Sequence, residues 1–333
     1  MSKVHHKSNI GEFDYDDEMF EIDDEGNLHL RDNYKGPIDL PKGCKSCLTM
    51  FENCDLSGCY FRDFYTSNVR TMEAMFKSCT LPEGFTLGDK FDTSSVDDMD
   101  EMFCDCKLPE GFTLGNKFDT SSVECMKGMF CDCKLPKGFT LGDKFDTSRV
   151  YNMYSMFNGC TFSDGFTLGD KFNTSNVTQM YSTFCECEMS EGFTLGAKFD
   201  TSNVINMGNM FQKCRMPNGF TLGDKFDTSN VKDMIRMFRA CIIPKGFSLG
   251  DKFDTSSVMN MWHMFSECDI PEGFTLGAKF VASDFVEMED IFHAAKLPSY
   301  CEGLSHSLAI IEVLKSTTAT SDCEEYSTSL FSE

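Results

Sequence analysis

The chain has 333 residues, enough for about two globular domains or one long repeat array. It carries 53 acidic and 30 basic residues, a formal net charge of −23. This balance disfavours binding to nucleic-acid phosphates and docking on anionic lipid, because both need clustered Lys and Arg. The composition is unusual in its 33 Phe, 22 Met and 18 Cys, which indicates that these residue types recur at fixed positions.

The first residues carry no export or membrane signal. Met1–Lys7 precedes an acidic stretch instead of an apolar segment with a cleavage site, and no run approaches ~18 consecutive apolar residues. Because disulfide scaffolds are typically short secreted chains, we expect reduced thiols and a cytoplasmic location without membrane insertion. The alternative is a protein at the cell surface, or one secreted by a route other than Sec.

The two ends of the chain differ from its middle. Residues 1–36 hold ten acidic and four basic residues without periodicity, which predicts an acidic N-terminal arm and cap. Residues 299–333 are predicted to form a C-terminal cap helix over Leu304–Leu314 and a Ser/Thr-rich acidic tail. Between them, residues 37–298 form a tandem repeat.

The repeat has a period of 27 residues. The string Gly-Phe-Thr-Leu-Gly starts at Gly84 and returns at that spacing up to Gly273, once with Ser in place of Thr. One unit reads G-F-T-L-G-D-K-F-D-T-S-x-V-x-x-M-x-x-M-F-x-x-C-x-L-P-x. Units near both ends of the array depart from this consensus, as capping repeats do.

Each unit divides into two parts. Apolar residues at Val96, Met99, Met102, Phe103 and Cys106 form one stripe of a helix or of tighter helical turns. Residues 92–94, Asp-Thr-Ser, provide N-cap side chains for that helix, and residues 85–87 alternate like a very short strand. A single unit cannot bury its apolar side chains alone, so units must stack. The predicted fold class is an α/β repeat, a leucine-rich-repeat-like solenoid of about nine strand-turn-helix units.

The repeat resembles a known family. Residues 174–177 and 201–204 read Thr-Ser-Asn-Val, and Met153, Met156, Phe157 and Cys160 continue the pattern in another copy. This motif resembles the BspA-type leucine-rich repeat, also called the mycoplasma-lipoprotein-type repeat, over about residues 44 to 298. The resemblance implies a surface protein, in some members an adhesin. The family's usual strand segment is replaced here by Pro-x-Gly-Phe-Thr-Leu-Gly-Asp-Lys.

Two groups of cysteines are candidates for a zinc site, because thiolates are preferred Zn²⁺ ligands. Their members are Cys104, Cys106, Cys131 and Cys133 in one group and Cys44 and Cys47 in the other. Cys106 and Cys133 belong to an inward column, whereas Cys104 and Cys131 stand two positions away from it. We expect buried filler plus two surface thiols in the first group, core filling in the second, and no metal or other cofactor.

The sequence offers little for catalysis. The six histidines do not recur with the repeat, and His263 and His293 are predicted to lie on different faces. No nucleophile motif or phosphate-binding loop is present, and the Gly-Phe-Thr-Leu-Gly glycines recur eight times where a phosphate loop would occur once. We therefore expect a protein that is not an enzyme.

The positions that vary between units point to a binding surface. They grade from acidic in early units to neutral, aromatic and partly basic in later ones. A docking strip for another protein is predicted at Tyr151, Tyr154, Tyr181, Ile205, Ile235 and Trp262. The predicted function is a non-enzymatic protein-interaction scaffold. The alternatives are an adhesin of the BspA-like type and a thiol-based metal or redox protein.

Overall fold

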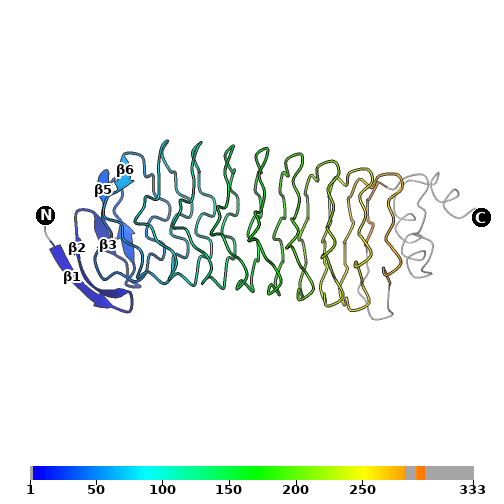
Figure 1. The fold of residues 1–333 in the computed structure, drawn as a ribbon, viewed down its shortest axis with the longest axis horizontal. Helices are drawn as coiled ribbons and strands as arrows, with labels where there is room; N and C mark the ends of the chain where they lie inside the picture. Colours follow the sequence, from blue (N-terminus) through cyan, green and yellow to red (C-terminus); the bar gives the residue numbers. More distant parts are fainter. Residues whose placement is uncertain (1–2, 282–289, 297–333) are drawn as a thin grey trace, which may run out of the picture. The chain divides into compact units, whose positions relative to one another are not determined.

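The computed structural model describes residues 3–281 and 290–296, so the predicted helix at Leu304–Leu314 lies outside the described residues. Contacts divide the chain into two compact units, Met1–Asn173 and Thr174–Glu333. In each unit, successive 27-residue repeats form coils of the backbone that stack on one another (Figure 1). Within the described residues, no helix is long and apolar enough to cross a membrane.

The N-terminal residues of the first unit form three small sheets (Figure 1). Strands β1 (Lys3–Ser8) and β2 (Gly11–Asp16) make an antiparallel hairpin, as do β3 (Phe20–Ile22) and β4 (Leu28–Leu30). Strand β5 (Gly36–Ile38) pairs in parallel with β6 (Cys59–Phe61). The Leu30 amide donates to the Met50 carbonyl oxygen at 2.9 Å, which joins the second hairpin to the first coil.

Parallel bridges between equivalent residues join the coils. In the first unit they pair Thr71 with Asp98 and Asp98 with Cys125. In the second unit they pair Asn206 with Asp233, and the series continues to Asn260. The two residues of each bridge are one repeat apart in sequence, so every coil pairs in register with its neighbour.

The predicted helix over residues 96–106 is wrong, because this segment is a series of tight turns. The Met102 amide donates to the Met99 carbonyl oxygen three residues back, at 3.3 Å. The amides of Glu101 and Phe103 instead donate to carbonyl oxygens of the next coil, at 2.7 and 2.9 Å. An α-helix needs those amides for carbonyls four residues back. The described residues contain no helix, and the strand-turn-helix solenoid is overturned.

Each of these turns contains a residue in the left-handed conformation, and the residue types at that position do not indicate it. Glu101 and Asp105 have φ values of 54° and 52°, and Arg236 and His263 have φ values of 52° and 58°. Turns of this kind normally place Gly or Asn at that position. The bonds between coils hold the backbone there, so a wide range of side chains is accepted.

The predicted strand at residues 85–87 is also absent. Phe85 and Leu87 are buried and Thr86 is exposed, as expected, but this segment is not a strand. It lies between turns that begin at Pro82 and Gly88, closed by amide donation from Phe85 at 3.0 Å and from Phe91 at 3.3 Å. The repeat therefore contains turns and extended links where the sequence predicted regular elements.

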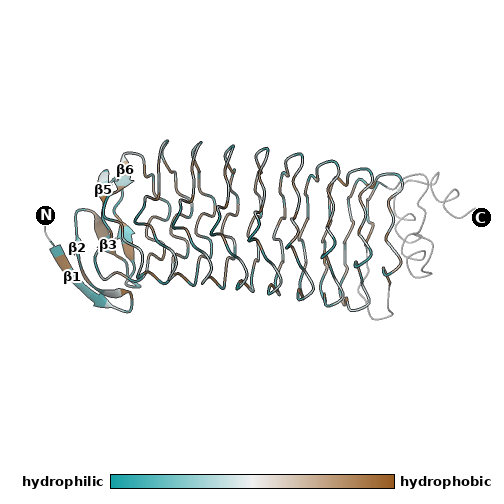
Figure 2. Cartoon of the chain, in the orientation of Figure 1, coloured by the Kyte–Doolittle hydropathy of each residue, from teal (hydrophilic) through white to brown (hydrophobic). Residues whose placement is uncertain are grey.

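Apolar side chains fill the interior of each coil, and hydrophobic stretches recur from coil to coil (Figure 2). Equivalent phenylalanines stack on one another: ring centroids are 5.3 Å apart between Phe76 and Phe103, and 5.6 Å between Phe211 and Phe238. The inward Met and Val columns are fully buried. Stacking thus buries what a single unit would expose.

A buried threonine that recurs every 27 residues from Thr66 to Thr255 replaces the predicted helix cap. The Thr93 hydroxyl donates to the Asp119 carbonyl oxygen at 2.8 Å and accepts from the Asp119 amide at 2.7 Å. The same pair of bonds joins Thr201 to Asp227 in the second unit, at 2.8 Å each. We call this column the threonine ladder, and it cross-links adjacent coils through their interior.

Candidate functional site

The outward residues of the turn segments are the candidate binding surface. In the first unit, Tyr151 and Tyr154 follow each other on one coil and are 50% and 39% exposed. The Lys127 ammonium lies 5.9 Å from the Tyr154 ring centroid, a cation–π geometry that holds the ring. The two tyrosines of the predicted strip that belong to the first unit therefore face solvent.

The second unit holds the other four predicted residues. Ile205 is 46% exposed, whereas Tyr181, Ile235 and Trp262 are half-buried. Met259 was not among the predicted residues, although it is 66% exposed at the repeat position of Ile205. The sequence did contain a signal for Met259, because this apolar residue stands where several other repeats carry a polar side chain.

Charge accumulates on the outer face of the first unit. Burial and the neighbouring Asp98, Asp100 and Glu101 raise the pKa of Glu73. Burial and the carboxylates of Asp100 and Asp97 outweigh a backbone hydrogen bond and raise the pKa of Asp98. These carboxylates repel one another, which disfavours their charged forms.

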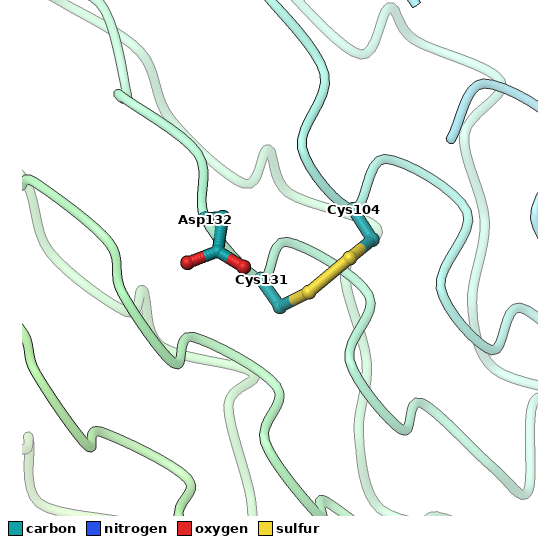
Figure 3. A group of neighbouring side chains, drawn as sticks. All are labelled: Cys104, Cys131 and Asp132. Carbon is teal, nitrogen blue, oxygen red and sulfur yellow. A yellow bond between two sulfur atoms is a disulfide. The ribbon is translucent and has the colours of Figure 1, made fainter. Parts of the chain in front are cut away.

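The four thiols of the candidate zinc site at Cys104, Cys106, Cys131 and Cys133 do not converge. Cys104 and Cys131 form a disulfide between adjacent coils, with their Cα atoms 4.5 Å apart (Figure 3). Their sulfur atoms and a carboxylate oxygen of Asp132 lie within 4.8 Å of one another. A sulfur in a disulfide is not a thiolate, so this cluster has no thiolate ligand in its oxidised form.

Cys106 and Cys133 lie instead in the buried inward column, which we call the thiol ladder. The Cys133 thiol donates to the Phe103 carbonyl oxygen at 2.9 Å, and the Cys160 thiol to that of Phe130 at 2.9 Å. Burial raises the pKa of Cys133 to about 12. These thiols are therefore neutral donors that bridge coils.

The second cysteine group is buried as well. Cys47 is fully buried, and the Cys44 thiol donates to the Ser46 carbonyl oxygen at 3.1 Å. Burial raises the pKa of Cys44 to about 11. Both side chains fill the core of the first coil.

The expected separation of two histidines is wrong. The ring centroids of His263 and His293 lie 6.2 Å apart on successive coils. Burial lowers the pKa of His263, although Asp290 partly opposes this. The turn series places these two repeat positions side by side, which a helical assignment did not allow.

Comparison with protein families identifies the repeat. The family described as "Mycoplasma protein of unknown function, DUF285" matches five overlapping stretches, residues 45–162, 110–219, 137–241, 162–274 and 190–300. The chain belongs to this family. The DUF285 matches follow the tandem repeat, which confirms a mycoplasma-type repeat protein but not the BspA-type identity. No curated protein and no solved structure matches the chain.

Proposed function

We propose that this DUF285 chain is a non-enzymatic protein-interaction scaffold, as its sequence predicted. One observation carries the proposal. Large apolar side chains replace polar ones at outward repeat positions, with Tyr151, Ile205 and Met259 at least 46% exposed. Exposed Tyr, Trp and Met side chains are typical of binding surfaces.

The mechanism is display of side chains on a regular backbone. Hydrogen bonds between coils fix each outward residue relative to the equivalent residue one repeat away. A partner therefore gains several small contacts without ordering a loop, which lowers the entropic cost of association. The partner is another protein, not a nucleic acid or a membrane.

A triple variant, Tyr154→Ser with Tyr181→Ser and Trp262→Ser, tests this proposal. Full-length protein is immobilised, extract of the producing cells is passed over it, and bound proteins are identified by mass spectrometry. We expect the triple variant to lose capture while its circular dichroism is unchanged. The matched control replaces Tyr60 and Tyr65, which are 56% and 60% exposed at other positions, with Ser. Capture retained by the triple variant would contradict the proposal.

An adhesin of the BspA-like type, at the surface or secreted, is the second candidate. The Cys104–Cys131 disulfide favours it, because disulfides persist mainly in oxidising compartments. The other described cysteines are free thiols, which supports the cytoplasmic location of the first proposal. Alkylation of denatured protein from its native source separates the two: all 18 thiols free favours the cytoplasm, and a protected Cys104–Cys131 pair favours export.

A further inference from the structure

The outer face of the second unit joins apolar and cationic side chains. We call it the aromatic–basic face and define it by Tyr181, Ile205, Lys232, Ile235, Arg236 and Trp262. The Lys232 amide donates to the Ile205 carbonyl oxygen at 2.8 Å, so these two residues lie on adjacent coils. The Arg236 guanidinium carbon lies 5.2 Å from the centre of the Trp262 ring system. The face is held by the backbone and by this stacking.

A glycine makes the apolar part of this face continuous. Gly208 lies between Tyr181 and Ile235 at the same repeat position. A Cβ atom on Gly208 would come within 2.8 Å of the Tyr181 ring and 2.9 Å of an Ile235 methyl group. Without that atom, the two side chains close over the glycine and leave one surface.

The described residues leave the cations of this face without a neutralising carboxylate. Across residues 3–281 and 290–296, no carboxylate lies within ion-pair distance of Lys232 or Arg236. By contrast, Lys213 pairs with Glu186 at 2.7 Å on neighbouring coils. In a chain of net charge −23, two unpaired cations beside an apolar patch favour an acidic partner.

The first unit carries the complementary charges at the same repeat positions. Asp97 occupies the position of Lys232 and Asp100 that of Ile235, five repeats earlier, whereas Glu101, at the position of Arg236, is paired with Lys77 and Lys127. Asp97 and Glu73 are exposed, and neither forms an ion pair in the described part of the chain. We call Glu73, Asp97, Asp98 and Asp100 the acidic face.

The two faces also share one spacing. Equivalent rings on neighbouring coils stand 5.3 Å apart in the first unit, from Phe76 to Phe103, and 5.6 Å apart in the second, from Phe211 to Phe238. Because the coils have nearly the same spacing in both units, side chains on neighbouring coils of one face can oppose side chains on neighbouring coils of the other without loss of register. Every copy of the chain therefore carries an acidic face whose coil spacing matches that of the aromatic–basic face and whose charge is opposite.

We propose that the aromatic–basic face binds the acidic face of a second copy, so that the protein self-associates. This inference rests on the proposed interaction function and names the partner. The contact excludes water from Ile205 and Ile235 while Lys232 and Arg236 meet carboxylates. It also relieves repulsion among the carboxylates of the acidic face.

Two charge-reversed variants of the full chain test the contact. One carries Glu73→Lys and Asp97→Lys, and the other carries Lys232→Glu and Arg236→Glu. Sedimentation velocity at low salt should show self-association of the wild type, weakened roughly tenfold or more in each variant alone. An equimolar mixture should associate again, because each variant then offers the face that the other needs. Higher salt should weaken association of the wild type and of the mixture.

Each result has one meaning. A monomeric wild type at high concentration, or a mixture that stays monomeric while both variants are folded, overturns self-association. The capture experiment above is read separately: loss of capture by the Ser variant with a monomeric wild type leaves the scaffold intact and removes only the second copy as partner. Restored association of the mixture also excludes misfolding as the cause of the single-variant defects.

Discussion

The two units use the same interior and present different exteriors. Thr93 in the first unit and Thr201 in the second make the same bonds to the next coil, each donating at 2.8 Å. At one outward position, however, the first unit carries Asp97 and the second carries Lys232. Bonds between coils and buried ladders hold the fold, so the outward residues can change charge without changing the backbone.

The sharpest way to break this contrast is to place a charge inside. Met180→Asp introduces a carboxylate at a fully buried position, and we expect a loss of about 3–5 kcal/mol in the free energy of unfolding. Urea denaturation followed by the fluorescence of Trp262, the only tryptophan in the chain, reports on the second unit.

The matched control makes the same change outside. Met259 is 66% exposed in the same unit, so Met259→Asp should alter stability by less than about 0.5 kcal/mol. Equal destabilisation by both substitutions would show that the assigned interior and exterior are wrong.

The same contrast shows which features the sequence could reveal. The 27-residue period and the buried Phe, Met and Cys columns follow from recurrence alone, because only stacked copies can bury them. The helix prediction failed because three- and four-residue spacing is shared by helices and by successive turns. Helices and successive turns differ in which carbonyl oxygen accepts each amide hydrogen bond. The Glu101 amide, for example, donates to a carbonyl oxygen of the next coil. The acceptor lies one repeat away in the sequence, so no local sequence signal identifies it.

The outer site was predictable only in part. The exposure of Tyr151 and Tyr154 was predicted, because aromatic residues at varying positions are visible in sequence. The Cys104–Cys131 disulfide was not found, because both cysteines were expected to be reduced surface thiols standing away from the inward column. The complementary charges of Asp97 and Lys232 were visible only as a gradient, since their common repeat position gains meaning once the coils are known to stack.

A covalent difference between the units gives the second prediction. The disulfide closes a loop of sequence separation 27 in the first unit, which corresponds to about 3.5 kcal/mol in the chain-entropy account. Cys104→Ser with Cys131→Ser should raise hydrogen exchange in residues 97–134 and leave the Trp262 transition unchanged. Cys185→Ser, at the same repeat position in the second unit, is the control. Unchanged exchange in residues 97–134 would show that the bond does not stabilise these coils.

The threonine ladder predicts a smaller effect that should be the same in either unit. Thr201→Val removes the hydroxyl that contacts both the carbonyl and the amide of Asp227, leaving two backbone groups without their partner. The expected cost is about 2 kcal/mol, measured as a shift in the urea midpoint. Thr221→Val changes an exposed threonine of the same unit and should cost less than about 0.5 kcal/mol. A near-neutral Thr201→Val would mean that the ladder does not hold the coils together.

The thiol ladder predicts the smallest effect, and it depends on pH. Burial raises the pKa of Cys160 well above its usual 9.0, so the folded protein keeps this proton where the unfolded chain releases it. The contribution of this thiol to the free energy of unfolding is therefore fully present below pH 9. It falls as the pH rises above that value, by about 1.4 kcal/mol per pH unit for each such thiol. Cys160→Ser keeps a donor for the Phe130 carbonyl oxygen but does not ionise in this range. The free energy of unfolding of this variant is measured by hydrogen exchange in the first unit between pH 9 and 10.5. It should fall less steeply with pH than that of the wild type, and the difference in slope should be about 1.4 kcal/mol per pH unit. Parallel pH profiles would mean that this thiol titrates normally in the folded chain, and that the inward column is open to water as the outer face is.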